Sequence, residues 1–419
     1  MDSETDVLIV GGGQAGLAMS EHLTERGISH VILERSRIAE RWRSERWDSL
    51  VANGPAWHDR IPSMEFADVP SDEFATKDQI VEYLETYAKK IDAPIRTGIE
   101  VTSVTKNLGT QNFRIETSDG AMTARFIVAA TGPFQKPQIP AMVPDDSPIE
   151  QIHSSAYRNP QQLADGSVLV VGSGSSGVQI SEEIQRSGRQ TYLAVGPHNR
   201  PPRKYRDRDI VWWLGVLGKW EASAPSPDTE HLTIAVSGAN GGRTVDLRRL
   251  ATEGVQLLGR AEYFNKGNIH FANDLVDNVK NGDANYLSLL NEADAYISRN
   301  GLNLPEEPEA HQLGTDPECL INPTHNIDIT DANIKTIIWA TGFRLNYDWL
   351  HVDTFQEGGL PRHHRGISAE PGLYFIGLPW LSRLASGFIW GCWHDAKFIA
   401  DQIQIQNKYR AHQASRLSY

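Results

Sequence analysis

Two glycine-rich turns have the spacing that suits the pyrophosphate of a dinucleotide. Each follows a short apolar run and precedes an amphipathic stretch, which predicts the order strand, turn, helix. The first glycine of such a turn permits the tight bend, the second lets the backbone approach the phosphates, and the third lets the helix pack on the strand. The candidate residues are Gly11, Gly13, Gln14, Ala15 and Gly16 in the first turn and Gly172, Gly174, Ser175, Ser176 and Gly177 in the second. The repetition predicts two dinucleotides in one protein.

A carboxylate follows the first turn at the spacing that an adenine dinucleotide requires. Glu34 ends the apolar run 31–33 and lies about 20 residues beyond the turn. An acidic side chain there accepts hydrogen bonds from a ribose 2′-hydroxyl, so the first site is expected to take FAD. Arg35 is a further candidate for this site, and a solvated glutamate at a strand end is the alternative interpretation.

The second unit lacks that carboxylate and carries a basic cluster instead. Its second strand, expected over 191–195, ends in Gly196 and is followed by the candidates Arg200, Arg203 and Lys204. Arginine binds phosphate through paired N–H donors, so the cluster favours a 2′-phosphate and hence NADPH. NADH stays open because Gly196 also permits it, and a solvated basic loop is the alternative interpretation of the cluster.

Each turn has a later partner strand that ends in Ala-Thr-Gly. The two motifs are Ala130, Thr131 and Gly132 and, in the second copy, Ala340, Thr341 and Gly342. A buried strand with this ending brings small residues against a bound cofactor. The repeated order is more specific than any one of these motifs.

The stretch 41–50 is rich in arginine and tryptophan. It is expected to form a loop over the first nucleotide, with guanidinium groups near phosphate and indole rings over the ring system. Its candidate contacts are Arg41 and Trp42, and Val101, in the strand region 95–127, is a further one. A nucleic-acid patch also interleaves arginine with aromatic residues, but the acidity of the whole chain counts against it.

The motifs occur in the order glycine-rich turn, Ala-Thr-Gly, His-x-x-x-Tyr, glycine-rich turn, Ala-Thr-Gly, with His153 and Tyr157 as the middle pair. This order resembles that of the class B flavin-dependent monooxygenases, and within them the flavin-containing monooxygenases and the YUCCA-like enzymes. Half of the family's linker fingerprint is present, because Ser147 and Ile149 stand where phenylalanine and glycine are expected. The resemblance covers nearly the whole chain and is thin from about 207 to 334.

The resemblance implies a flavin-dependent NAD(P)H monooxygenase. In such an enzyme NADPH reduces FAD by hydride transfer, and dioxygen adds at the flavin C4a carbon. The resulting peroxide or hydroperoxide delivers one oxygen atom to a small organic substrate. Asn53 lies where relatives carry an asparagine facing the C4a side, and its amide would orient the oxygen adduct. Asn53-Gly54 is also an ordinary turn signal, and His153 fits a hinge or gating role.

Two other functions stay open, and a third is excluded. An NAD(P)H oxidase that produces hydrogen peroxide needs the same nucleotide sites, and so does a non-catalytic flavin or nucleotide sensor. A disulfide reductase needs a redox cysteine pair, whereas Cys319 and Cys392 are the chain's two cysteines and lie far apart in the sequence. Trp212 and Trp390 indicate an aromatic or apolar substrate pocket, and the residues do not choose among an amine, a sulfide, an aromatic acid and a ketone.

An α/β fold with two Rossmann-like dinucleotide-binding domains would position these motifs. The NADPH domain is expected to be inserted into a discontinuous FAD domain. The expected boundaries are 1–158 for the first part of the FAD domain, 159–330 for the NAD(P)H domain and 331–419 for the second part of the FAD domain. A chain of 419 residues is long enough for this arrangement.

Composition limits the partners. A formal net charge of −13 argues against binding to nucleic acid or to anionic lipid. No apolar run is long enough to cross a bilayer, and the acidic start 1–4 does not read as a signal peptide, so we expect a cytoplasmic protein without membrane association. His363, His364 and His394 do not form a recognisable metal set, so no metal is expected. The expected partners are a small-molecule substrate and O2, and a homodimer stays open.

Overall fold

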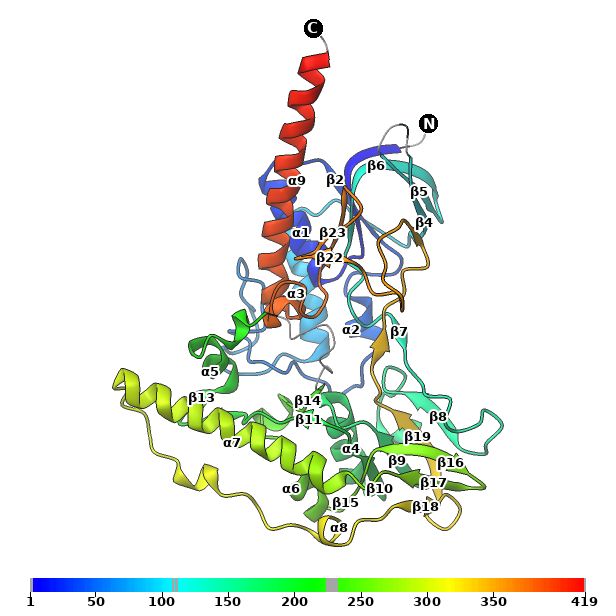
Figure 1. The fold of residues 1–419 in the computed structure, drawn as a ribbon, viewed down its shortest axis with the longest axis vertical. Helices are drawn as coiled ribbons and strands as arrows, with labels where there is room; N and C mark the ends of the chain where they lie inside the picture. Colours follow the sequence, from blue (N-terminus) through cyan, green and yellow to red (C-terminus); the bar gives the residue numbers. More distant parts are fainter. Residues whose placement is uncertain (1–2, 108, 110–111, 224–232, 418–419) are drawn as a thin grey trace.

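The computed structural model describes residues 3–107, 109, 112–223 and 233–417 and shows two lobes, each built around its own β-sheet (Figure 1). The N-terminal sheet forms the upper lobe in that view, and the second sheet forms the lower lobe. The C-terminal helix, drawn in red, extends beyond the upper lobe.

The upper sheet combines parallel strands with an antiparallel meander. Its strands are β1 (Ser3–Val10), β2 (His30–Glu34), β3 (Ile95–Thr97), β4 (Val101–Lys106), β5 (Phe113–Thr117), β6 (Gly120–Ala129), β21 (Leu350–His351), β22 (His363–His364), β23 (Ile367–Ser368) and β24 (Leu373–Phe375). β3, β2, β1 and β6 are neighbours in that order and pair in parallel, and β6, β5 and β4 form the meander. β24 returns from the C-terminal part of the chain and pairs in parallel with the end of β6.

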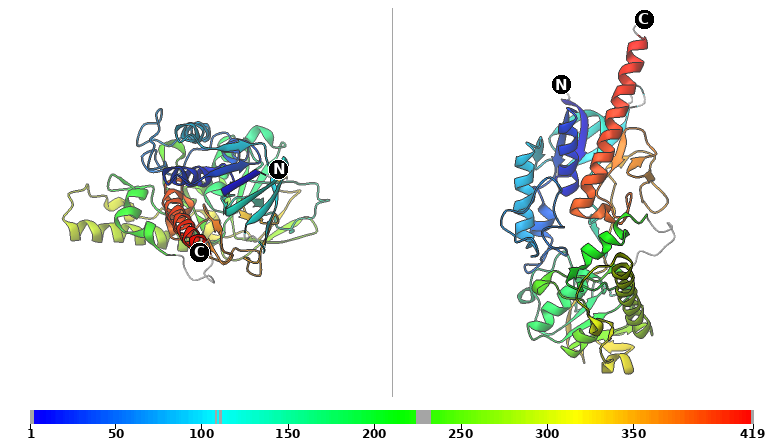
Figure 2. Two further views of the ribbon diagram at one scale, coloured as in Figure 1. Left: turned by 90° about the horizontal axis from the view of Figure 1, so that it is seen from above. Right: turned by 90° about the vertical axis from the view of Figure 1, so that its left-hand side faces the viewer.

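Helices α1 (Gln14–Glu25), α3 (Lys77–Lys90) and α9 (Ile389–Leu417) pack on one face of this sheet. Figure 2 shows α1 and α9 side by side. Val7 and Ile9 of β1 belong to the core under these helices, whereas Leu8 and Val10 belong to the core under the meander. This alternation along β1 is the period of two that a strand buried on both faces requires.

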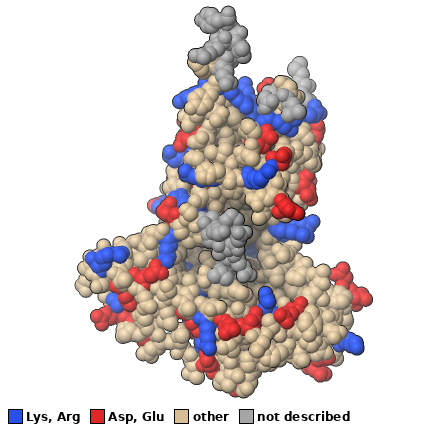
Figure 3. All heavy atoms as spheres, in the orientation of Figure 1, with Lys and Arg blue, Asp and Glu red and all other residues tan. Residues whose placement is uncertain are grey.

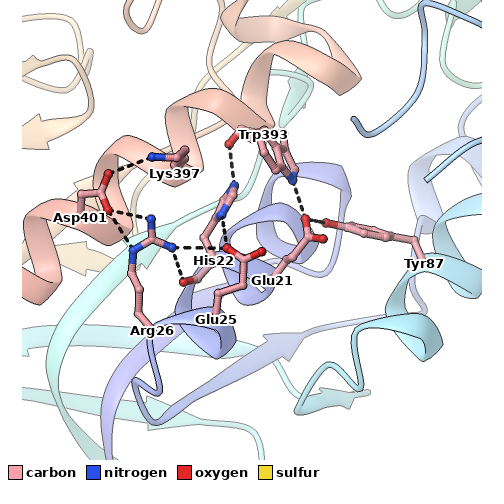
Figure 4. A network of polar contacts seen from close by, with 8 residues as sticks. All are labelled: Glu21, His22, Glu25, Arg26, Tyr87, Trp393, Lys397 and Asp401. Atoms are coloured by element: carbon pink, nitrogen blue, oxygen red, sulfur yellow. Dashed lines mark hydrogen bonds and ion pairs between the residues drawn. The ribbon is translucent and has the colours of Figure 1, made fainter. Parts of the chain in front are cut away.

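A network of polar contacts fixes α9 to α1 (Figure 4). Glu21 accepts a hydrogen bond from the indole N–H of Trp393. The Nε2 of His22 lies 3.1 Å from the carbonyl oxygen of Trp393, and burial lowers the pKa of His22. Farther along, Arg26 binds Asp401 at 2.6 Å. Because α9 starts at the cavity described below, these contacts fix one wall of that cavity.

The lower sheet is entirely parallel. Its strands, in spatial order, are β15 (Val255–Leu258), β10 (Thr191–Ala194), β9 (Ser167–Val171), β19 (Ile334–Trp339) and β8 (Glu150–His153). β8 and β19 lie outside the expected range 159–330, so this sheet extends past those boundaries at both ends. The reason is burial, because Ile337, Ile338 and Trp339 of β19 are all 0 % exposed between β9 and β8. The predicted α/β class with two Rossmann-type units is confirmed.

The remaining elements surround the lower sheet and the junction of the lobes. The helices are α2 (Glu40–Ser44), α4 (Ser175–Arg186), α5 (Ile210–Val216), α6 (Leu247–Thr252), α7 (Leu275–Asn300), α8 (Glu318–Ile321) and the 3₁₀ segments η1 (Pro160–Gln162), η2 (Lys219–Glu221), η3 (Ala239–Gly241), η4 (Pro308–His311) and η5 (Leu384–Gly387). The short strands are β7 (Lys136–Pro137), β11 (His198–Asn199), β12 (Lys204–Tyr205), β13 (Arg208–Asp209), β14 (Thr233–Ile234), β16 (Ala261–Asn265), β17 (Asn268–Phe271), β18 (Asn326–Asp328) and β20 (Phe343–Arg344).

Candidate functional site

The carboxyl ends of parallel strands from both sheets meet at one cavity of about 1600 Å³, which we call the main cavity. β1, β2 and β6 of the upper sheet and β9, β10 and β19 of the lower sheet all end at or next to residues that line it. Figure 3 shows the surface hollowed between the two lobes, with acidic and basic side chains interspersed around the hollow. Ligands of open α/β sheets bind at this end of the strands, so the topology places the candidate site at the junction of the lobes.

The first glycine-rich turn joins β1 to α1, and two of its glycines leave no room for a side chain. Gly11 has a φ of +113°, and a Cβ there would lie 2.6 Å from the carbonyl oxygen of Ala130. A Cβ on Gly16 would lie 2.0 Å from the carbonyl oxygen of Gly11. Gly13 is the N-cap of α1 and has no side chain to satisfy the first N–H groups of the helix. These N–H groups at the cavity wall suit a phosphate.

The second turn repeats this geometry between β9 and α4. Gly172 has a φ of +112°, and a Cβ there would lie 2.5 Å from the carbonyl oxygen of Ala340. A Cβ on Gly177 would lie 1.7 Å from the carbonyl oxygen of Gly172, and Gly174 is the N-cap of α4. In both units the first glycine of the turn therefore packs against the alanine of an Ala-Thr-Gly motif.

Glu34 is held with its carboxylate at the wall of the main cavity. Its Oε2 accepts the Gly12 N–H at 2.7 Å, and its Oε1 accepts the Ser36 N–H at 2.8 Å. Both oxygens are thereby oriented, and each keeps a further lone pair that a ribose hydroxyl can use.

The arginine- and tryptophan-rich stretch covers one side of the main cavity. Arg41 binds Glu45 at 2.7 Å and also donates to the carbonyl oxygen of Phe134, so its guanidinium is held by the protein. Arg46 lies over the ring of Trp42 at 5.8 Å and over the ring of Phe134 at 5.0 Å. Burial lowers the pKa of Arg46 to about 10, which still leaves it charged at neutral pH. Arg46 was not among the expected contacts, and it is a cation that lines the main cavity.

The expected basic cluster does not lie at the main cavity, which corrects the assignment of a 2′-phosphate to it. The Arg200 side chain is 5 % exposed and binds Asp283 of α7 at 2.7 Å. Arg203 is 2 % exposed and forms an ion pair with Asp209. Lys204, on β12, does not line the cavity either. The two arginines are buried because carboxylates from other segments pair with them, as buried charges require.

Another arginine lines the main cavity beside the second turn. Arg260 follows β15, the strand next to β10, and its side chain is 61 % exposed. Its Nε lies 3.9 Å from the nearer carboxylate oxygen of Asp274, a distant contact. Gly196 and Pro197, which follow β10, line the same part of the site. No local sequence pattern marks Arg260, because its position follows from the spatial order of the strands.

Asn53 lines the main cavity and is held from the opposite lobe. Its Oδ1 accepts a hydrogen bond from the Nε2 of Gln179 at 3.1 Å, and its backbone carbonyl accepts one from Arg203. Gln179 lies on α4 and is fixed by a second bond, to the carbonyl oxygen of Val236 at 2.9 Å. The amide nitrogen of Asn53 is the group left to act on a bound molecule.

Both residues of the His-x-x-x-Tyr pair are held by hydrogen bonds within the protein. The Nε2 of His153 lies 2.9 Å from the carbonyl oxygen of Gly342, and burial lowers the pKa of this ring. Tyr157 is fully buried and donates to Glu183 of α4 at 2.8 Å. His153 therefore anchors the second Ala-Thr-Gly motif, and Tyr157 anchors the helix of the second turn.

The main cavity brings together most of the expected residues. Of the expected set, Gly16, Gly177, Arg200, Arg203 and Lys204 do not line it. The expected residues that line it are Gly11, Gly13, Gln14, Ala15, Glu34, Arg35, Arg41, Trp42, Asn53, Val101, Ala130, Thr131, Gly132, Gly172, Gly174, Ser175, Ser176, Ala340, Thr341 and Gly342.

Among the described residues, no group of three or more His, Cys, Asp or Glu side chains is placed to hold a metal ion. In the same part of the chain, no helix combines the length and the apolar character that a membrane crossing needs. Cys319 and Cys392 are both buried, and neither forms a disulfide.

Comparison with known proteins identifies relatives along the whole chain. Residues 8–214 match the family described as pyridine nucleotide-disulphide oxidoreductase. An uncharacterized CzcO-like oxidoreductase of Geobacillus kaustophilus is 32% identical over 96% of this chain and 99% of its own. The probable indole-3-pyruvate monooxygenase YUCCA1 of Arabidopsis thaliana is 30% identical over 88% of this chain and 84% of its own.

A solved structure shares the fold at lower identity. The flavin-containing monooxygenase of Stenotrophomonas maltophilia superposes with a TM-score of 0.66 at 20% identity, over 97% of this chain and 99% of its own.

Proposed function

The chain belongs to the class B flavin-dependent monooxygenases, and from this membership we propose that it is an FAD-dependent, NADPH-consuming monooxygenase. It inserts one atom of O2 into a small organic substrate and reduces the other atom to water. One observation carries the proposal. Helices α1 and α4 each have a glycine N-cap, each follows a strand of a different sheet, and both begin at the main cavity. Two dinucleotides bound at these helices would meet in the same space.

FAD binds to the upper lobe. The N-terminus of α1 would hold its pyrophosphate, and Glu34 would accept a hydrogen bond from its adenosine ribose. The open space at Gly13 fits this group, because a Cβ there would meet no atom within 4 Å and the bare backbone leaves the phosphates room to approach. Bound FAD supplies the hydride acceptor and, once reduced, the group that reacts with O2.

NADPH binds to the lower lobe at the N-terminus of α4. Its adenosine lies along Gly196 and Pro197, and Arg260 binds its 2′-phosphate. The support for Arg260 is its exposed guanidinium at this end of the main cavity and its distant contact with Asp274. A guanidinium binds phosphate through paired charge-assisted hydrogen bonds.

Arg260→Gln is expected to raise the KM for NADPH about tenfold and to leave the KM for NADH unchanged, because one charge-assisted contact is lost. Steady-state flavin reduction with each nucleotide measures the change. Arg243→Gln is the matched control, since Arg243 is 42 % exposed and pairs with Glu182 outside the main cavity. An equal rise in the KM for both nucleotides would show that Arg260 does not bind the 2′-phosphate.

Asn53 acts on the reacting oxygen through its amide N–H. Gln179 holds the Asn53 carbonyl oxygen, which turns the nitrogen toward a bound molecule. A donor already oriented at the place where negative charge develops costs no reorganisation during the reaction.

Asn53→Ala is expected to lower the yield of oxygenated product per NADPH roughly tenfold, with hydrogen peroxide released instead. The rate of flavin reduction should stay unchanged, because Asn53 acts after that step. Peroxide and NADPH are measured in parallel, with any substrate that raises NADPH consumption. Asn300→Ala, in the exposed last turn of α7, is the control. A fall in the reduction rate without loss of product yield would contradict this role.

The proposal as a whole is tested by the electron balance with amines, sulfides, aromatic acids and ketones as substrates. A monooxygenase consumes NADPH faster with its substrate and releases less peroxide than the NADPH consumed. Peroxide equal to NADPH with every class would make the protein an NAD(P)H oxidase. No consumption of NADPH at all would make it a sensor.

A further inference from the structure

A second pocket of about 420 Å³, largely open to the surface, lies next to the main cavity, and we call it the side chamber. It forms where the segment 57–62, α5, η2 and the start of α9 come together. Figure 1 shows α5 at the level of the junction between the lobes. The residues that carry the argument are Trp57, His58, Arg60, Trp212, Trp220 and Trp390. A volume of this size is typical of small-molecule sites.

The walls of the side chamber are aromatic. The rings of His58 and Trp220 stack with centroids 5.2 Å apart, and Trp390 meets Trp220 edge to face at 5.7 Å. Trp57 meets His58 edge to face at 5.5 Å. Such walls offer ring faces and edges at which a planar aromatic molecule gains both apolar burial and aromatic packing.

The side chamber and the main cavity share a wall one residue thick. His58 lines the side chamber and Asp59 lines the main cavity, and His58 Nδ1 lies 2.7 Å from Asp59 Oδ1. Phe388, immediately before α9, lines the main cavity, and Trp390, in the first turn of α9, lines the side chamber. A ligand in the side chamber would therefore lie beside the part of the main cavity in which α9 starts.

Two buried polar atoms in these walls have no partner among the described residues. They are the Nε2 of His58, whose side chain is 8 % exposed, and the indole Nε1 of Trp390. A buried polar atom without a hydrogen bond is costly. The indole N–H can only donate, so the missing partner of Trp390 is an acceptor such as a carboxylate or carbonyl oxygen.

Among the described residues that line the side chamber, Arg60 is the one arginine, lysine, aspartate or glutamate. Arg60 lines the chamber, and its weak contacts are the carbonyl oxygens of Trp57 at 3.2 Å and Pro62 at 3.4 Å and the largely exposed Glu65 at 3.4 Å. A cage of aromatic rings can also bind ammonium groups by cation–π attraction. The guanidinium of Arg60 opposes such a cation and favours an anion.

We propose that the side chamber binds an aromatic carboxylate, with the ring between the tryptophans and the carboxylate at Arg60. That this ligand is the enzyme's substrate class rests on the proposed function, whereas its binding does not. The shared wall places it beside the main cavity, in which the nucleotides of the proposed function would bind.

Three ligands with the same phenyl ring test the proposal on the full-length protein carrying FAD. They are 3-phenylpropionate, its uncharged amide, and 3-phenylpropylamine. The tryptophans of the chamber report binding through their fluorescence, which the phenyl ring does not mask. We expect the acid to bind about tenfold more tightly than the amide, because a charge-assisted contact is added, and the amine to bind most weakly.

Two variants locate the site, and one serves as control. Arg60→Gln should reduce the affinity for the acid to that for the amide and leave the amide unchanged. Trp212→Leu should lower the affinity of the protein for all three ligands. Arg96 lies on β3 and forms an exposed ion pair with Asp119, so Arg96→Gln should leave the affinity for all three ligands unchanged.

The outcomes separate this proposal from the proposed function. An amine that binds as tightly as the acid, or an Arg60→Gln variant that loses both acid and amide equally, would overturn the proposal. The proposal would also be overturned if the acid did not bind to protein in which NADPH reduces the flavin. If the acid binds as expected but NADPH does not reduce the flavin, the result would support the proposed ligand of the side chamber and contradict the proposed monooxygenase function. Stimulation of NADPH consumption by the acid alone would support both.

Discussion

Gly177→Ala is expected to slow the reduction of bound flavin by NADPH about 100-fold or more, while the purified protein keeps its FAD. A Cβ on residue 177 would lie 1.7 Å from the Gly172 carbonyl oxygen and 2.8 Å from its carbonyl carbon. Both are backbone atoms, so α4 itself must move away from the second turn. A displacement of about 1 Å at a binding element is enough for an effect of this size. The rate is measured by anaerobic rapid mixing with NADPH.

The control for this substitution is Gly314→Ala. A Cβ on Gly314 would meet the nearest atom, on the side chain of Arg248, at 3.8 Å, which is ordinary contact. Its rate of flavin reduction should match the unsubstituted protein. If Gly177→Ala also lost its FAD, the second turn would not be a separate nucleotide site. If its reduction rate were unchanged, α4 would not bind NADPH.

Gly16→Ala is expected to yield protein without FAD. The new Cβ would lie 2.0 Å from the Gly11 carbonyl oxygen, so α1 and the first turn cannot keep their present packing. Overpacking of this kind costs about 1–3 kcal/mol of stability, and the displaced N-terminus of α1 loses its hold on the pyrophosphate. Flavin absorbance per protein after purification measures the loss, and circular dichroism shows whether the chain is folded.

The reciprocal pattern is the informative result. Gly16→Ala should lose FAD and still bind NADP⁺, measured by calorimetry, while Gly177→Ala should do the opposite. A Gly16→Ala protein with full FAD content would contradict the assignment of the first turn to FAD.

The nucleotide turns could be predicted from the sequence because their requirements are local. Gly11 and Gly172 must adopt a positive φ and leave no side chain against the neighbouring strand, and both needs appear as glycine at fixed spacing. The alanines on which they pack, Ala130 and Ala340, were recognised by their repetition alone. Glu34 was found by its distance from the turn.

The expectation for the basic cluster is wrong for Arg200 because its partner is distant in the sequence. Asp283, which pairs with Arg200, lies on α7, and that pairing exists only when α7 packs against the segment after β10. Arg260 could not be predicted from the local sequence either, because its place beside the second turn depends on β15 lying next to β10. The side chamber likewise joins four elements whose order along the chain does not show that they are in contact.

The expected domain boundaries stay a prediction, and the sheet pairing shows what limited them. The expected boundaries place β8 in the first part of the FAD domain and β19 in its second part. Both pair within the lower sheet, on the far side of β9 from β10. A crossing point is set by which strand a segment pairs with, and the local sequence does not determine that choice.

The central claim is that two nucleotides meet in the main cavity, and anaerobic mixing of the purified flavoprotein with NADPH tests it most directly. The account predicts rapid loss of the visible absorbance of oxidised flavin, faster with NADPH than with NADH at equal concentration. Admission of oxygen should then restore the absorbance. A flavin that stays oxidised with both nucleotides, in protein that carries full FAD, would contradict the account.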